Sequence, residues 1–401
     1  MVGMVMLYAI LLLLCQDVDQ LIQDLGHDRG EIRESATKIL INMGKKAIPR
    51  LENAMKHSND VEVWQRSIKI LEDINYSIQL DVAINPRGPI TLSHVDVPLN
   101  MVLKDLAKQT NLDIICPNQT KVTINARGNY LIPILDNVGA QIDKQWSFHR
   151  DAVVWSEGFV KSPHTYDKGM KVTLARLDVY KSFDNKEYKS LAWAYLKLYT
   201  EPQTKLMGTP SFELSTILID NEEAPIDSLI QNASPTTMVG TYESSPFTIN
   251  KNSNIKVLNK LAGQVKMHFA AKYHDVVMDI NYEDYITKTD YRSMEFRIVD
   301  YGYEGVTSMA VEFSDSWASE QPVMYIGNYV DTTSFVVVEH DGTEYKGEEL
   351  SIDVRQDNLN TMKYDITIDG KCPYIKTIKF RVVDKVLEHS VPFSFNNIAI
   401  P

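Results

Sequence analysis

The sequence predicts a multidomain protein of the α+β class. Its 401 residues exceed what one ordinary hydrophobic core organises. The hydrophobic residues repeat with a helical period up to about residue 75 and with a strand-like alternation from Lys171 onward. Between these segments, residues 90–157 mix both periods. We therefore expect N-terminal α-helical hairpins, a small βαββα domain, and then two mainly antiparallel β-sandwich domains.

Charge excludes one class of partner. The formal net charge is −12, and residues 158–401 carry 25 Lys and Arg against 34 Asp and Glu. A field of this sign repels phosphate backbones, and the sequence has no basic stripe that would offset it. We therefore expect no nucleic-acid partner.

Residues 1–15 are expected to be a signal peptide. Met4–Leu14 is an unbroken apolar run of 11 residues. As a helix it would rise about 16 Å, too little to cross a hydrocarbon core of roughly 30 Å, but its length suits a signal-peptide core. No Lys or Arg precedes the run, so a buried first helix is the alternative. We therefore expect an exported protein, periplasmic or at the cell surface. Leu12–Cys15 resembles a lipoprotein cleavage box, which implies lipidation at Cys15 as one alternative, but Leu14 stands where that box has a small residue.

Residues 16–80 predict four short amphipathic helices. Apolar side chains recur at helical spacing, with Gly26 and Gly44 as helix ends, Pro49 near a helix start and Asp60 in a capping position. The last helix is expected to face the others through Ile68, Leu71 and Ile74. A set of residues at fixed positions in these helices characterises the segment: Arg33, Ala36, Gly44, Ala47-Ile48-Pro49-Leu51, Asp60, Val63 and Arg66.

On these residues the segment resembles paired HEAT-like repeats. Repeats of this kind bury their faces only against neighbours. The resemblance leaves two readings open: a small helical cap, or a ridge that docks a peptide or protein.

Residues 81–157 predict a small mixed domain. Strand 90–94 leads into Asp96-Val97-Pro98-Leu99 and a helix over 98–109, and strand 121–126 precedes a second helix beginning near Leu131. This pattern resembles the short N-terminal domain of secretins and TonB-dependent receptors, which implies binding to partner proteins or packing against neighbours. The second half departs from the family phrase, with Arg127-Gly128-Asn129-Tyr130-Leu131 in its place.

Residues 158–250 and 251–401 predict the two β-sandwiches. Short alternating runs recur about every ten residues, and Asp341-Gly342 and Asp369-Gly370 suit hairpin turns. The polar stretch 244–254 is expected to be the linker. Phrases such as WAYLKLYTEPQTKLMGTPSFELSTILIDNEEAPI and the ending VPFSFNNIAIP resemble uncharacterised secreted bacterial proteins that place HEAT-like or short mixed domains before paired β domains. That resemblance implies architecture and no substrate.

The search for chemistry yields no predicted catalytic, cofactor-binding or metal-binding residue. The nine His residues form no metal spacing, and His268 and His274 flank an expected break between strands. Two clusters of acidic residues are expected to be solvated surface charge. Calcium binding and glycoside hydrolysis are the alternative roles for them. Cys116 and Cys372 are expected to be isolated thiols or a bridge. The acidic groups are Asp279, Glu283 and Asp284, and Asp220, Glu222, Glu223 and Asp227.

Aromatic residues define the remaining candidate. Trp193, Tyr195 and Tyr199 share one strand face at a period of two, which suits core packing or, alternatively, a glycan platform. Trp317, Tyr325 and Tyr329 are further candidates. We therefore expect a non-enzymatic, exported interaction or scaffold protein of the bacterial envelope, with unidentified protein partners. The alternative is a carbohydrate-binding protein that uses its β domains.

Overall fold

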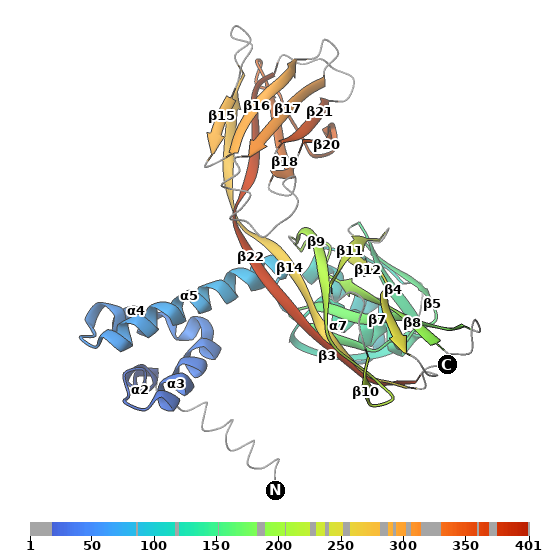
Figure 1. The fold of residues 1–401 in the computed structure, drawn as a ribbon. Helices are drawn as coiled ribbons and strands as arrows, with labels where there is room; N and C mark the ends of the chain where they lie inside the picture. The colour runs from blue at the N-terminus through green and yellow to red at the C-terminus, as the bar shows by residue number, and fades with distance from the viewer. Residues whose placement is uncertain are drawn as a thin grey trace. The chain divides into compact units, whose positions relative to one another are not determined.

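The computed structural model describes most of the chain, in two compact units that comprise Met1–Val82 and Ala83–Pro401 (Figure 1). The two units are considered separately below. The described residues are 18–85, 87–116, 120–150, 152–182, 189–204, 206–224, 230–236, 240–251, 257–280, 288–291, 294–301, 306–313, 330–358, 361–368 and 375–399. The expected leader 1–15 and Cys372 lie outside them.

The first unit is helical, as expected. Its helices are α2 (Val18–Asp24), α3 (Gly30–Met43), α4 (Ile48–His57) and α5 (Val61–Ile84), with a short 3-10 turn η1 (Gly44–Lys46) before α4. Gly44 adopts a positive φ of 58° as the C-cap of α3, and Pro49 lies in the first turn of α4. Both positions follow from the residues: glycine tolerates the positive φ, and proline lacks an N–H that the first turn would leave unsatisfied. Helix α5 continues to Ile84, past the boundary expected at residue 80.

The face by which α5 packs differs in part from the prediction. Val63, Ile70 and Ile74 are 6%, 0% and 1% exposed and belong to the helical core, and Leu71 packs against its margin. Ile68 was expected in this core and does not belong to it. The buried stripe follows positions 63, 67, 70 and 74. The predicted face of 68, 71 and 74 was therefore rotated by less than the 100° that separates consecutive residues on a helix.

The second unit begins with the mixed segment predicted over residues 81–157. The element order agrees with the prediction and is extended by a hairpin at its end, β4–β5, because KQWSFH and AVVWSE pair antiparallel. Strand β2 joins this hairpin in parallel with β5. The elements are β1 (Ile90–Pro98), α6 (Leu99–Thr110), β2 (Asp113–Ile114), β3 (Lys121–Asn129), α7 (Leu131–Ile142), β4 (Lys144–His149) and β5 (Ala152–Glu157).

This segment is built from two βα halves offset by 32 residues. In the first, the Gln109 side-chain amide donates to Thr91 O (3.0 Å) and accepts from Thr91 N (3.1 Å). In the second, Gln141 makes the same two bonds with Thr123, at 3.0 and 2.9 Å. Strands β1 and β3 pair antiparallel with each other. Each glutamine therefore hydrogen-bonds the backbone N–H and C=O of one threonine, on the edge of the strand that faces away from the other strand.

The backbone of the two halves repeats in the same way. Asp96 and Gly128 occupy equivalent places and have positive φ angles of 52° and 66°. The helices end in left-handed caps at Asn111 and Asp143. The departure from the family phrase at Gly128 therefore keeps the same turn, because glycine and aspartate both tolerate this conformation.

Most later strands form one large, mainly antiparallel sheet, in the order β19-β18-β22-β14-β9-β11-β12-β8-β7-β6. At the far end β6 and β7 lie against β22, and His389 Nε2 lies 2.7 Å from Asp167 Oδ2. The sheet thus curls until β6 reaches the second half of β22. Its strands are β6 (His164–Asp167), β7 (Met170–Ser182), β8 (Lys189–Tyr199), β9 (Leu206–Ile219), β10 (Glu222–Glu223), β11 (Ile230–Pro235), β12 (Thr241–Ser244), β13 (Phe247–Lys251), β14 (Val257–Asp279), β18 (Val330–Glu339), β19 (Glu344–Lys346) and β22 (Ile375–Ala399).

A second sheet packs on the first half of β22 and the second half of β14, and these layers form a sandwich. Phe296, Phe335 and Phe380 meet in its core, with ring centroids 5.1 Å apart for Phe296–Phe380 and Phe335–Phe380. The order of the second sheet is β15-β16-β17-β21-β20. Its strands are β15 (Lys288–Tyr291), β16 (Met294–Tyr301), β17 (Val306–Phe313), β20 (Leu350–Asn358) and β21 (Thr361–Ile368).

Strands pair across the division predicted at residues 250/251, because β14 also pairs with β9. β14 and β22 pair along their whole lengths, and they belong both to the curled sheet and to the sandwich (Figure 1). The expected linker 244–254 contains β13, which pairs with β8 and buries Phe247 and Ile249 completely. The expected break near His268 and His274 is a bulge at Ala270–Tyr273 inside one continuous strand. Polar residues at a bulge gave the appearance of a boundary.

No helix among the described residues is long and apolar enough to cross a membrane.

Candidate interaction surface

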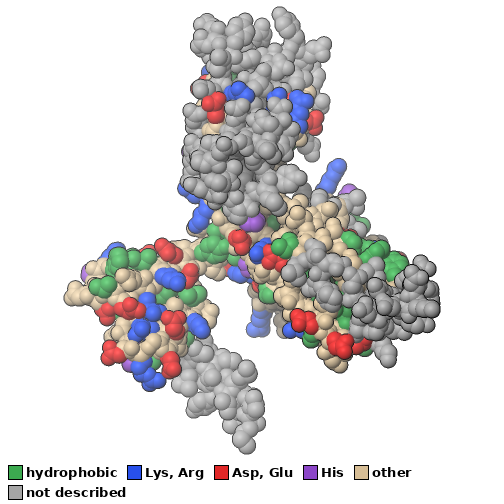
Figure 2. All heavy atoms as spheres, in the orientation of Figure 1, with side chains coloured by type: hydrophobic (Ala, Val, Ile, Leu, Met, Phe, Trp, Pro, Cys, Tyr) green, Lys and Arg blue, Asp and Glu red, His purple; other side chains and the backbone are tan. Residues whose placement is uncertain are grey.

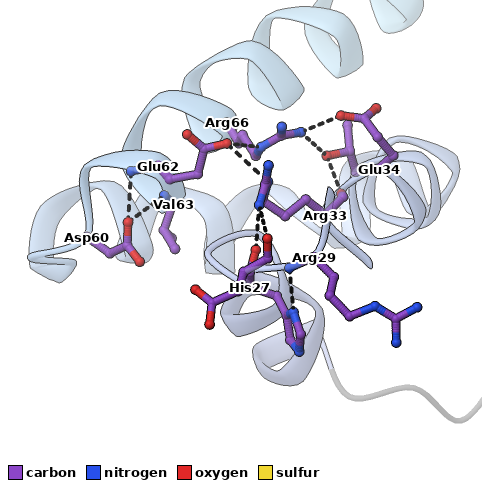
Figure 3. Close-up of polar contacts among 10 residues, drawn as sticks. His27, Arg29, Arg33, Glu34, Asp60, Glu62, Val63 and Arg66 are labelled. Carbon is purple, nitrogen blue, oxygen red and sulfur yellow. Dashed lines mark hydrogen bonds and ion pairs between the residues drawn. The ribbon is translucent and has the colours of Figure 1, made fainter. Parts of the chain in front are cut away.

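The helical unit is held together by a network of charged side chains (Figure 3). Arg66 of α5 donates to Glu62 Oε1 (2.6 Å) and to Glu34 Oε1 of α3 (2.9 Å). Arg33 donates to the His27 and Asp28 carbonyls at 2.7 and 3.0 Å. The hydrogen bond and charge of Arg66 lower the pKa of Glu34. The network links α3 to α5, and it provides hydrogen-bond donors for the backbone carbonyls that follow α2.

The start of α5 is fixed by a capping aspartate. Asp60 Oδ1 accepts from the backbone N–H groups of Glu62 (2.8 Å) and Val63 (3.3 Å), which satisfies two donors of the first turn. Gly26 lies directly against this cap: a Cβ there would overlap Asp60 Oδ2 and lie 2.9 Å from Val63 Cγ2. The end of α2 and the start of α5 therefore pack as closely as a glycine allows.

Beside this contact the unit is hollowed. A groove of about 430 Å³ lies between α2, α4 and the start of α5. Its volume is within the range of ligand-binding clefts. Ile22, Ala54 and Val63 give it apolar surface. The polar lining residues are Asp19, Gln23, Arg50, Asn53, His57, Ser58 and Asp60.

Exposed apolar side chains also lie in the first turn of α5, the helix that lines the groove with Val63. Val61 and Trp64, in the first turn of α5, are 67% and 44% exposed. They precede Ile68 and Leu71 at helical spacing, so a half-exposed apolar stripe runs along α5 next to its buried face. Figure 2 shows hydrophobic side chains among charged ones on the helical unit.

The arrangement suits a protein segment. Side-chain amides such as Gln23 and Asn53 both donate and accept hydrogen bonds, as a peptide backbone requires. The apolar surface of the groove and Trp64 can receive apolar side chains, and tryptophan dominates many binding interfaces. The Arg50–Asp19 ion pair at 3.6 Å neutralises part of the rim.

Sequence reasoning did not assign these groove residues. For the exposed Val61 and Trp64 the available signal is the phase of α5, because both are apolar yet lie outside the stripe 63, 67, 70 and 74 that forms the core. An apolar side chain out of phase with a buried face indicates an exposed surface.

The three predicted aromatic residues of β8 separate into two environments. All three lie on the face of β8 opposite Ala192, Ala194, Leu196 and Leu198, which are at most 1% exposed. Tyr199 packs against Trp146 of β4, with ring centroids 5.7 Å apart, and burial raises its pKa to about 12. Trp193 and Tyr195 lie further along, where Trp193 meets Tyr180 of β7. Trp317, Tyr325 and Tyr329 lie outside the described residues.

The acidic candidates have local structural roles where the structure describes them. Asp220 has a φ of 50° in the turn between β9 and β10 and accepts from Val257 N at 3.0 Å. Glu222 and Glu223 are exposed on β10. Asp279 accepts from Thr377 Oγ1 across β14 and β22 at 2.8 Å. Asp227, Glu283 and Asp284 lie outside the described residues.

Histidine and cysteine candidates are also placed. His268 Nε2 lies 3.5 Å from Glu388 Oε2 on the neighbouring strand. Cys116 is 7% exposed in the core of the mixed segment. Across the residues that the structure describes, no three His, Cys, Asp or Glu side chains gather in a way that could hold a metal ion.

A buried charged cluster, missed by sequence reasoning, joins the mixed segment to the curled sheet. Asp136 of α7 is 8% exposed and accepts from Trp146 Nε1 (2.8 Å), from Lys171 Nζ (3.0 Å) and from the Tyr166 hydroxyl. Burial, together with this carboxylate, raises the pKa of Tyr166. An aspartate among the apolar positions of a helix was the available signal, since a buried carboxylate requires partners.

Comparisons with known proteins give no family. No family model matches the chain, and no curated protein matches it. Among the solved structures that match, one is described as the crystal structure of the conserved domain protein from Bacillus anthracis. It is 11% identical, with a TM-score of 0.18, over 59% of this chain and 90% of that one.

Proposed function

We propose that the protein is a non-enzymatic interaction protein of the bacterial envelope that binds a segment of another protein on its helical unit. The observation that carries the proposal is the groove between α2, α4 and the start of α5, the helix whose first turn also exposes Val61 and Trp64. The resemblance of residues 17–75 to HEAT-like hairpins supports the same role. The segment bound would place an apolar side chain on Ile22 and Ala54.

Site-specific photocrosslinking in the native cell tests this proposal. A benzophenone amino acid is introduced at Gln23 or Asn53, which line the groove, and at Lys69 as the control, exposed on another face of α5. We expect one protein, identified by mass spectrometry, to crosslink from both groove positions and not from Lys69. Equal crosslinking from all three positions, or different proteins from the two groove positions, would contradict the groove as the docking surface.

Export is the second part of the proposal. It rests on the apolar run Met4–Leu14 and on the lipoprotein-like Leu12–Cys15. Cell fractionation with mass spectrometry of the mature N-terminus tests it. We expect a periplasmic or surface fraction and a chain that begins after the run, with an acylated Cys15 if the lipoprotein pattern is used. A cytoplasmic protein that retains residues 1–15 would contradict export.

A further inference from the structure

The outer face of β7 and β8 carries a second set of exposed side chains, in the other unit. Residues 192–199 of β8 alternate between a buried face and an outer face, as strand geometry requires. At the Tyr199 end the outer face is covered, because Trp146 and Lys171 pack there. Among the described residues, these contacts end toward Trp193. The sheet face is thus divided into a packed end and an open end.

The open end presents aromatic rings. Tyr180 is 49% exposed, and its ring centroid lies 4.7 Å from that of Trp193, with the planes inclined by 54°. Tyr195 follows on the same face of β8, with the Arg176 guanidinium 3.9 Å from its ring centroid. Tyr180 was not among the candidates from the sequence. It joins them because β7 pairs with β8 in a register that places Asp178 opposite Trp193.

Charged groups alternate with these rings and neutralise one another. Arg176 Nε lies 2.9 Å from Asp178 Oδ2, and Lys197 Nζ lies 3.2 Å from Glu243 Oε2. All four side chains are between 27% and 58% exposed. The two pairs bring hydrogen-bond donors and acceptors to the surface without a net charge.

This combination matches the chemistry of a sugar. A pyranose ring has an apolar C–H face that stacks on aromatic rings, and its hydroxyls both donate to carboxylates and accept from guanidinium or ammonium groups. The balanced charge of the face and the acidic chain disfavour polyanions.

We propose that Tyr180, Trp193 and Tyr195, with the Arg176–Asp178 and Lys197–Glu243 pairs, form a binding face for a neutral polysaccharide. Tyr180 and Trp193 stack against sugar rings, and the ion pairs bind hydroxyls. The face lies on different elements from the helical groove, so either surface can be correct without the other.

Affinity gel electrophoresis of the full-length protein tests the inference. Gels contain a neutral polysaccharide (mixed-linkage β-glucan, xyloglucan, galactomannan or amylopectin) or the polyanion alginate. We expect at least one neutral gel to retard the wild type and alginate not to. Trp193→Ala and Tyr180→Ala should each weaken that binding at least about tenfold, as loss of an interface anchor does. The matched control is Tyr76→Ala, an exposed aromatic of α5 that is 38% exposed, and it should bind like the wild type.

Circular dichroism confirms that each variant is folded, and a Trp193→Phe variant, which keeps an aromatic ring, should retain part of the affinity. Three results would overturn the inference. They are unretarded migration of the wild type in every neutral gel, retardation by alginate alone, and equal binding by folded Trp193→Ala and Tyr180→Ala.

Discussion

Lys104 in the first βα half and Asp136 in the second occupy the same place in a repeat of 32 residues, yet their surroundings are opposite. Lys104 is exposed, whereas Asp136 is 8% exposed and bound by Trp146 and Lys171. The contacts that hold the backbone are the same in both halves, since Gln109 and Gln141 make matching hydrogen bonds to their strands. Residues shared by the two halves therefore set the fold of each half, whereas residues that differ between them decide what the half packs against.

The helix starts differ in the same sense. Leu99 N of α6 donates to the Thr120 carbonyl at 3.0 Å, a bond that does not titrate. The equivalent Leu131 N of α7 donates to Glu201 Oε1 at 3.4 Å. Burial raises the pKa of Glu201 to about 7, opposed by the charge of Arg87 and by the Leu131 N–H. The second half therefore depends on a group that titrates near neutral pH, and the first does not.

The largest expected effect comes from breaking the Asp136 cluster. Asp136→Asn leaves the Lys171 ammonium, whose side chain is 12% exposed, without its counter-charge. Removing one partner of a buried pair costs about 3–5 kcal/mol. Urea unfolding followed by circular dichroism should show this loss, while the control Lys104→Ala at the equivalent place stays within about 0.5 kcal/mol. A cost below about 1 kcal/mol would mean that the cluster does not hold the two parts together.

The next effect is a pH dependence carried by Glu201. Its folded-state pKa is raised, so the folded protein binds the proton more tightly than the unfolded chain. The stability from this group is then lost as the pH rises from about 4.5 to about 7, by about 3 kcal/mol. Glu201→Gln should unfold like the wild type near pH 5 and be more stable at pH 8. Parallel pH profiles of the two proteins, compared by urea unfolding, would rule out a buried carboxyl with this pKa.

A smaller effect separates the two positive-φ turns. Gly128→Ala places a Cβ in the left-handed region and should cost about 1–2 kcal/mol. The matched change in the first half, Asp96→Gly, relaxes the backbone and loses only the exposed Lys121–Asp96 pair, a loss of about 0–1 kcal/mol. Thermal unfolding compares the two variants. A larger loss for Asp96→Gly than for Gly128→Ala would show that the turns are not equivalent.

The smallest effect sharpens the likeness of the halves. Gln109→Ala removes two exposed hydrogen bonds to Thr91, and Gln141→Ala removes the matching two to Thr123 together with its bonds to Asn137. Each variant should cost about 1 kcal/mol. Hydrogen exchange should show faster exchange at the Thr91 amide in the first variant and at the Thr123 amide in the second. Unchanged exchange at both amides would contradict these hydrogen bonds.

Local patterns predicted much of the fold. The apolar stripe Leu99, Val102, Leu103 and Leu106 is buried as helical spacing requires, and Asp60 caps α5. Long-range pairing could not be predicted. β14 was expected to break near His268 and His274, where the strand has a bulge, because alternation defines a strand segment and does not show that two segments are continuous.

For the candidate surfaces, too, local spacing could be predicted from the sequence and long-range packing could not. Trp193 and Tyr195 could be placed on one face from their spacing, but Tyr180 joins them only through the register of β7 with β8. Likewise Tyr199 could not be separated from Trp193 by sequence, since its packing on Trp146 comes from a different part of the chain. The groove required α2 and α4 to be positioned before its lining could be known.

The central claim is that the helical groove binds a protein segment, and an affinity measurement tests it most directly. The partner identified by crosslinking is purified and titrated calorimetrically against the wild type, Trp64→Ala and the control Lys69→Ala. We expect Trp64→Ala to raise Kd at least about tenfold, since a tryptophan anchor contributes about 1.4 kcal/mol or more, and Lys69→Ala to leave Kd unchanged. Equal Kd values for the wild type and a folded Trp64→Ala would contradict the claim.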